Sequence, residues 1–199
     1  MMGALHELAL GFADPVSDAQ RTFRAALRAL SRPGEVVECA APVPAVAGLM
    51  PATVALLLAL TDHETPVWWG CSGPVQWLRF HTGAPAAARP VDAHFAVVAC
   101  TLAVPELTLL NAGTDESPAN STTLLIELPS LAGGAATLWS GPGLREPRAM
   151  HLPGLPEGFW AQWQDNHTRF PSGVDVFFTS RRHIVGLPRT TSVQATEGH

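Results

Sequence analysis

Three short segments of this chain place an arginine beside threonine hydroxyls. Arginine carries a planar fork of N–H donors that matches a phosphate group, and neighbouring hydroxyls or backbone amides can complete such a site. For each segment the alternative is a solvated helix face or an ion pair within a loop. The candidate anion-binding or interface residues are Arg21, Arg24, His81, Thr82, Arg189, Thr190 and Thr191.

The positive charge of the chain is confined to its two ends. All 12 basic residues are arginines, and residues 90–144 contain none of them. An anion site built from several arginines therefore requires the two ends to meet in space. The sequence predicts such a site only where they do.

Composition excludes several classes of chemistry. The 17 acidic residues leave a net charge of −5, which is not the footprint of a protein that neutralises a nucleic-acid backbone. Without lysine, neither a pyridoxal phosphate Schiff base nor a P-loop can form. No serine lies in a G-x-S-x-G frame, and no histidine-carboxylate spacing predicts chelation. We expect no cofactor and no metal.

The cysteines indicate a reducing compartment. Cys39, Cys71 and Cys100 are widely spaced, form no C-x-x-C motif, and each ends a predicted strand. Free cysteine is among the most often buried residue types, so we expect all three in the core. Residues 1–12 lack the pattern of a signal peptide, and we expect a cytoplasmic location.

One apolar stretch is about long enough to span a membrane. Residues 40–60 carry no charge. However, Pro42 and Pro44 interrupt its first half, and Pro51 suits the first turn of a short helix. We therefore expect a proline-rich loop followed by a core helix over residues 51–61, and no membrane association.

The elements that must position these residues begin with a helix that ends before Arg32. Asp14 followed by Pro15 is a typical helix start. Helical periodicity puts arginines on one stripe, Arg21, Arg24 and Arg28. It puts apolar side chains on a neighbouring face, which we expect to be buried: Val16, Ala19, Phe23, Ala26, Leu27 and Leu30.

The rest of the chain alternates strands and helices. Strands are predicted over residues 35–39, 66–71, 94–100, 121–128, 136–140 and 174–179, and further helices over 73–80 and 157–167. Residues 129–134 read as the turn of a hairpin. In the last helix, the aromatic edge of Phe159, Trp160 and Trp163 is either core or a subunit contact. Together these elements predict one α/β domain over residues 1–199 with a mixed, mostly parallel sheet flanked by helices.

Six dispersed segments resemble the PhnH family, a subunit of the bacterial carbon-phosphorus lyase machinery. They occur in the order of that family and cover about residues 7–194. The segments are DPVSDAQRTFR (14–24), RPG (32–34), TPVW (65–68), RFHTGAP (79–85), FPSGVD (170–175) and LPRTT (187–191).

The resemblance implies phosphonate catabolism. It implies an accessory subunit, working with PhnG, PhnI, PhnJ and the ATP-binding PhnK, that supports formation of alpha-D-ribose 1-methylphosphonate 5-triphosphate from ATP and methylphosphonate. It also implies a homodimer and a fold similar to the large domain of PLP-dependent transferases. It carries over no catalytic residue, so we expect no catalysis by the isolated chain. The alternative is a stand-alone protein that binds a phosphorylated ligand through its arginines and threonines.

Overall fold

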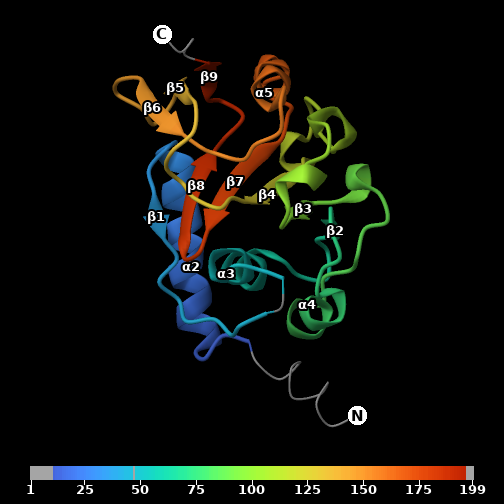
Figure 1. The fold of residues 1–199 in the computed structure, drawn as a ribbon. Coiled ribbons are helices and arrows are strands. Elements are labelled where there is room, and N and C mark those ends of the chain that lie inside the picture. Colours follow the sequence, from blue (N-terminus) through green and yellow to red (C-terminus); the bar gives the residue numbers. More distant parts are fainter. Residues whose placement is uncertain (1–10, 47, 196–199) are drawn as a thin grey trace.

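A six-stranded sheet forms the centre of the computed structural model, which describes residues 11–46 and 48–195 (Figure 1). Its strand order is β1-β8-β7-β4-β3-β2, in which β2, β3, β4 and β7 run parallel to one another, while β8 pairs antiparallel with both β7 and β1. The expected mixed, mostly parallel sheet is confirmed. The strands are β1 (Val37–Glu38), β2 (Val67–Trp69), β3 (Phe95–Val98), β4 (Thr123–Glu127), β7 (Asp175–Ser180) and β8 (His183–Leu187).

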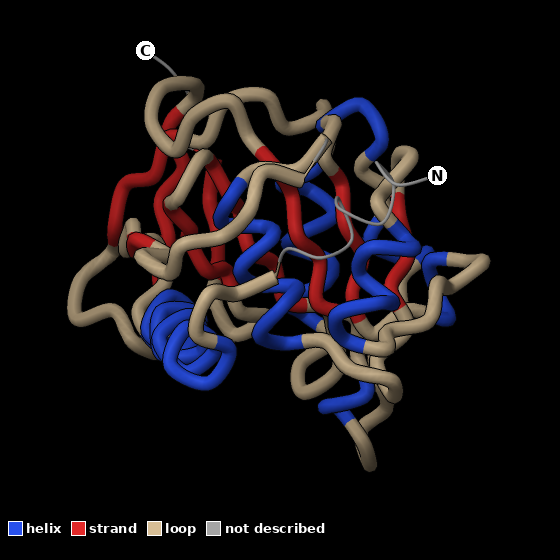
Figure 2. The backbone as a smooth tube through the Cα atoms, turned by 90° about the horizontal axis from the view of Figure 1, so that it is seen from below, coloured by secondary structure: helices blue, strands red, loops and turns tan. Residues whose placement is uncertain are grey.

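Both faces of this sheet are covered, so the fold has three layers. Leu125 and Phe177 face the layer of α2 (Pro15–Ser31), α3 (Pro51–Leu60) and α4 (Val75–Thr82). Their neighbours Ile126 and Phe178 face α5 (Phe159–Thr168) and a second sheet of β5 (Ala136–Ser140), β6 (Arg148–His151) and β9 (Ser192–Ala195). Figure 2, seen from below, shows helices of the first layer in front of the strands.

The helix starts follow local chemistry. The Asp14 side chain accepts a hydrogen bond from Ser17 N at 3.2 Å, and Pro15 fills the first turn of α2. α3 begins at Pro51 and has ten residues, most of them buried, as expected for a core helix. Among the described residues, none of the helices has the length and apolar character to cross a membrane.

The predicted hairpin over residues 121–140 is wrong. β4 lies in the large sheet between β3 and β7, whereas β5 pairs with β6 and β9 in the small sheet. The physical reason is that Leu124, Leu125 and Ile126 are all fully buried. A strand buried on both faces belongs in the centre of a parallel sheet, whereas hairpin strands usually keep one wet face.

The structure also decides two expectations about which side chains lie in the core. Phe159 and Trp163 are 1% and 0% exposed, so the aromatic edge of α5 is core. Cys39 is buried, but Cys71 is partly exposed and Cys100 is exposed. The core position expected for all three cysteines is therefore wrong for the latter two, because each lies two residues past the end of its strand, whereas Cys39 directly follows β1 and its backbone N–H still bonds Arg182 O at 2.7 Å.

The expected buried face of α2 is correct for Ala26 and wrong for three of its large apolar side chains. Val16, Phe23 and Leu27 are 69%, 54% and 57% exposed. The arginine stripe lies outward as expected. The buried side chains are mostly small: Asp18, Thr22, Ala29 and the expected Ala26.

The reason lies in how closely α2 approaches β8. A Cβ atom added at Gly186 would stand 2.5 Å from the carbonyl oxygen of Ala29, so helix and strand backbones are nearly in contact there. Large side chains do not fit between backbones at this spacing. α2 therefore turns its small residues inward and leaves its large apolar ones outside.

This contact predicts a large effect of a single methyl group. Gly186→Ala is expected to lower the free energy of unfolding by about 2–3 kcal/mol, because the added Cβ meets backbone that must shift. Thermal and urea unfolding of the variant measure this. The comparison variant is Gly70→Ala, because a Cβ atom added at Gly70 would stand 3.1 Å from its nearest neighbour, a milder contact. Gly133→Ala is unsuitable as a control, because the backbone φ of +91° at Gly133 would itself strain an alanine. An equal loss in both variants would contradict the account of the α2–β8 contact.

Candidate functional site

The outward side of α2 combines apolar and cationic side chains. Phe23 and Leu27 lie exposed beside Arg24 and Arg28. We call this surface the α2 face and include in it Val16, Arg32 and the two arginines of the β5–β6 region, Arg145 and Arg148. Large exposed apolar side chains bordered by arginines are typical of protein–protein contact sites.

Two adjoining depressions lie on the α2 face and share Arg32. The first, about 360 Å³, is lined by Arg24, Leu27, Arg28, Ser31 and Arg32. The second, about 690 Å³, joins α2 to residues 143–148 and includes Arg145 and Arg148. Arginines from before and after the arginine-free stretch therefore meet here. Of these arginines, only Arg24 was among the candidate residues of the three arginine–threonine segments.

Charge on the α2 face is only partly compensated. Glu35 pairs with Arg28 and, at 3.6 Å, with Arg32. The hydrogen bond from Arg28 lowers the pKa of Glu35. With Glu146, this leaves five arginines against two glutamates in a protein whose net charge is −5. The face thus has the opposite sign to the rest of the molecule.

Arg189 has no donor left for a ligand. Its backbone N–H and side chain bond Asp175, with Nη2 to Oδ2 at 2.6 Å. Nη1 donates to the carbonyls of Pro118 and Pro171 at 3.0 and 3.2 Å, and Nη2 donates to Ser121 Oγ at 2.5 Å. The guanidinium joins three loops around the amino ends of β4 and β7, which is a structural position.

The adjacent threonines also lie in a structural position. Thr191 is fully buried, and its carbonyl accepts a hydrogen bond from Trp163 Nε1 at 2.9 Å. Its hydroxyl has no hydrogen-bond partner among the described residues. Thr190, between Arg189 and Thr191, is partly exposed. The segment connects β8 to β9 and holds α5 against them.

The other candidates lie in different places. Arg21 on α2 binds Asp18 at 2.5 Å. On α4, Thr82 Oγ1 donates to Leu78 O at 2.9 Å, while His81 packs against the ring of Trp77. Figure 1 shows α4 and the β8–β9 connection at opposite ends of the molecule, so the three segments do not form one site.

An anion-binding role for these residues stays a prediction. Of the candidates, Arg24 alone lies on the α2 face. Calorimetry of the isolated chain with ATP and with methylphosphonate tests the role directly. Heat that disappears in Arg24→Ala would assign it to the α2 face.

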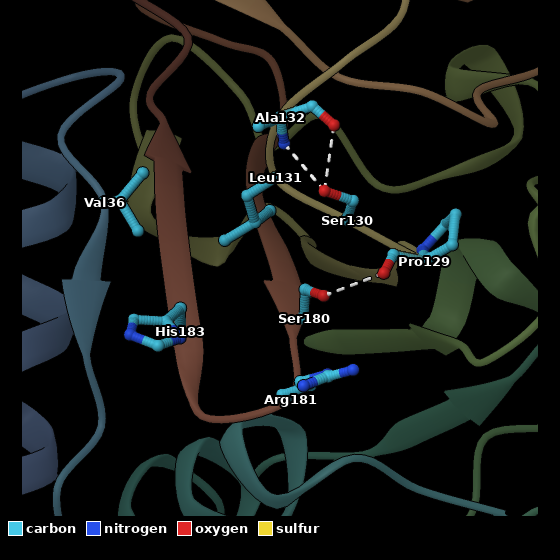
Figure 3. Close-up of a pocket in the computed structure, with 8 residues that line it drawn as sticks. All are labelled: Val36, Pro129, Ser130, Leu131, Ala132, Ser180, Arg181 and His183. Carbon is cyan, nitrogen blue, oxygen red and sulfur yellow. Dashed lines mark hydrogen bonds between the residues drawn. The ribbon is translucent and has the colours of Figure 1, made fainter.

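A further pocket, of about 510 Å³, lies at the carboxyl ends of the parallel strands (Figure 3). Leu131 and Val36 form its apolar part, the β7–β8 turn supplies Arg181, and His183 is the first residue of β8. The figure shows the Arg181 guanidinium extending away from His183, so the two cations do not converge on one point. Sequence analysis missed this turn, although its Arg-Arg-His run between two apolar segments was visible.

Glu127 is a buried carboxyl group that the sequence did not reveal. It ends β4, is 5% exposed, and accepts a hydrogen bond from Met50 N at 2.7 Å at the start of α3. Nearby, Thr53 and Thr179 share a hydrogen bond of 2.8 Å between their hydroxyls. Burial raises the pKa of Glu127 above its ordinary value of 4.5, partly offset by the hydrogen bonds from Thr53 and Met50.

The raised pKa makes a prediction about pH. The folded state favours the protonated carboxyl, so this group stabilises the fold at low pH, and that contribution is lost as pH rises through the raised pKa. Glu127→Gln keeps an acceptor for Met50 N and carries no charge. It is expected to unfold at higher urea concentration than the parent at pH 7 and to lose this advantage below pH 4.5. An advantage that grows toward low pH would contradict the assignment.

Among residues 11–46 and 48–195, no three His, Cys, Asp or Glu side chains are grouped as metal ligands would be. The contacts of Arg189, Thr191 and Glu127 described above hold loops and layers of the fold together. The α2 face is the surface that combines exposed apolar side chains with arginines.

Comparison with known proteins decides the family. A model of the family described as bacterial phosphonate metabolism protein (PhnH) matches residues 10–194. This chain belongs to the PhnH family. It is 36% identical over 187 residues to the alpha-D-ribose 1-methylphosphonate 5-triphosphate synthase subunit PhnH of Rhizobium meliloti (strain 1021), a match that covers 92% of this chain and 94% of that protein.

A shorter match is to a protein of Stutzerimonas stutzeri described as the putative C-P lyase subunit protein HtxG. It is 28% identical over 87 residues, 44% of this chain and 45% of the relative. The family resemblance found from the six segments is thereby confirmed.

Two of the PhnH-like segments meet in the structure. Asp175 closes the segment over residues 170–175, Arg189 lies in the one over 187–191, and the two side chains form an ion pair at 2.6 Å. The segment over residues 14–24, by contrast, contains Phe23 and Arg24 of the α2 face. In this PhnH-family chain the quoted segments thus include both internal contacts and exposed surface.

Proposed function

We propose that this chain is an accessory subunit of the bacterial carbon-phosphorus lyase system. In this role it supports formation of alpha-D-ribose 1-methylphosphonate 5-triphosphate from ATP and methylphosphonate. The observation that carries the proposal is the 36% identity that extends over 92% of this chain and 94% of the synthase subunit from R. meliloti. A match along nearly the whole of both chains supports an equivalent place in the assembly.

The α2 face is the surface through which we propose that the subunit docks. Its occupant is an acidic surface on another subunit of the complex. Charge supports this choice, because five arginines and two glutamates meet on this face of an otherwise acidic protein. A second copy related by a twofold axis would bring the same arginines toward one another. Phe23 and Leu27 would supply the apolar centre of the contact.

The finer parts of the proposal follow the family. The partners are PhnG, PhnI, PhnJ and PhnK, the chain itself forms a homodimer through a surface other than the α2 face, and the assembly acts in the cytoplasm. We also propose that the sheet is related to the large domain of PLP-dependent transferases. A chain without lysine cannot form the internal aldimine of those enzymes, so such a relation would be one of fold.

Adenine release tests the function. Supplied with ATP and methylphosphonate, the purified chain alone is expected to release no adenine. PhnG and PhnI together with this chain are expected to release it, and omission of the chain should lower the rate. Release by the pure chain, or an unchanged rate without it, would contradict the accessory role.

A further inference from the structure

Two cysteines lie side by side at the carboxyl edge of the large sheet. Cys71 comes two residues after β2, and Cys100 comes two residues after β3. The two strands are parallel neighbours in which Trp69 lies opposite Val97, and the pairing extends to a 2.9 Å hydrogen bond from Gly70 N to Val97 O. Continued by two residues, this register puts Cys71 opposite Ala99 and next to Cys100.

The spacing suits a covalent link. Neighbouring strands lie about 4.8 Å apart and rise about 3.3 Å per residue, so a diagonal pair has its Cα atoms about 5.8 Å apart, within the range of disulfides. The chain bends at Ala99 and Cys100, which ends the alternation of side chains along β3. The two sulfurs are near enough to interact: burial and the neighbouring Cys100 raise the pKa of the Cys71 thiol above its ordinary value of 9.0, which leaves the exposed Cys100 as the first thiol to react.

The two thiols are also accessible, in contrast to the third. Cys100 is exposed and Cys71 is partly exposed. Cys39 is 2% exposed, and burial raises the pKa of its thiol to about 12. Because the thiolate is the reacting form, Cys39 is inert at neutral pH and is an internal control.

We propose that Cys71 and Cys100 are a site of reversible disulfide formation by exchange with a small disulfide such as oxidised glutathione. The exposed Cys100 thiolate attacks one sulfur of oxidised glutathione, forms a mixed disulfide and releases one glutathione thiolate. The Cys71 thiolate then attacks the Cys100 sulfur and releases the second glutathione. Two protein thiols are oxidised, one glutathione disulfide is reduced, and each released thiolate takes up a proton lost from a cysteine.

The product would tie the β2–α4 connection to the β3–η2 connection, where η2 is the short 3₁₀ helix Thr101–Ala103. These connections lie at the edge of the sheet where parallel strands end. The proposal is independent of the function proposed above, since it concerns the chemistry of this pair alone.

Alkylation and intact mass test the proposal. The reduced, folded chain is expected to react with N-ethylmaleimide at Cys71 and Cys100 only. After incubation with oxidised glutathione it should react at neither, should weigh less by two hydrogen atoms, and should regain both sites with dithiothreitol. When the oxidised chain is unfolded, N-ethylmaleimide should react with Cys39 alone.

Single variants separate the steps. Cys71→Ser is expected to stop at a glutathione adduct on Cys100, and Cys39→Ser is expected to behave like the parent. Two outcomes would overturn the proposal: a parent chain that keeps glutathione on Cys100 at equilibrium, or one that stays fully alkylatable after treatment.

Discussion

Replacing Phe23 with Ser and Arg24 with Glu together is expected to release the chain from its partner subunits. Both side chains are exposed on α2, so the change removes docking contacts and leaves the core intact. Loss of a central aromatic side chain at an interface typically costs about 2–4 kcal/mol, which is about 30-fold to 1,000-fold in the dissociation constant. Reversal of the arginine adds repulsion from an acidic partner.

The measurement is the affinity of the chain for the assembled remaining subunits, by surface-immobilised titration at two salt concentrations. The parent should bind more weakly at high salt, because screening reduces attraction between exposed charges. Arg182→Glu is the matched control, since it reverses one exposed arginine in the β7–β8 turn. Unchanged affinity of the double variant would place the docking surface elsewhere and leave the proposed function standing.

Replacing Arg189 with Ala is expected to destabilise the fold by about 2–4 kcal/mol, because it breaks a largely buried ion pair and leaves acceptors without donors. Ser121 and the carbonyls of Pro118 and Pro171 lose their partner, and Asp175 loses both guanidinium bonds while it keeps the hydrogen bond from the backbone N–H at position 189. The side chains of Arg189 and Asp175 are only 12% and 22% exposed, so water compensates little.

Urea unfolding of Arg189→Ala measures this loss. The chain offers a matched control in Arg89. Its guanidinium also forms two hydrogen bonds to one carboxylate, that of Asp92, each of 2.7 Å, but both side chains are exposed to solvent. Arg89→Ala should hardly change the unfolding midpoint. Equal shifts in the two variants would refute the structural position of Arg189, and normal stability with lost ligand binding would restore its anion-binding role.

Local signals in the sequence predicted elements well. Asp14 and Pro15 marked the start of α2, and Pro51 marked the start of α3, because caps and proline act through the nearest residues alone. The short apolar run of β8 was missed, since a glycine at position 186 weakens any strand pattern.

The direction of α2 depended on a partner far away in the sequence. Its periodicity correctly showed an apolar stripe with Phe23 and Leu27, but periodicity cannot say whether a stripe meets the core or another protein. That was decided by Gly186, which admits only small residues against β8. The apolar stripe remained outside beside the arginines, and this is the origin of the α2 face.

The anion-binding role of the candidate residues stays a prediction, and the arginines that the fold brings together are mostly not those candidates. An anion-attracting surface was expected where the two arginine-bearing ends of the chain meet, and Arg32 and Arg145 do meet. Arg189, one of the candidate residues, has all its guanidinium N–H groups bonded inside the chain. Glu127 gave no signal, because a strand-end carboxylate becomes the cap of α3 only through tertiary contact.

The central claim is that this chain works as a docked subunit, and native mass spectrometry of the assembly tests it most directly. A tagged copy purified from cells grown on methylphosphonate is expected to carry PhnG, PhnI and PhnJ in fixed ratio, and the Phe23→Ser, Arg24→Glu variant is expected to carry none of them. A parent chain that emerges alone, with the other subunits assembled and active without it, would contradict the account.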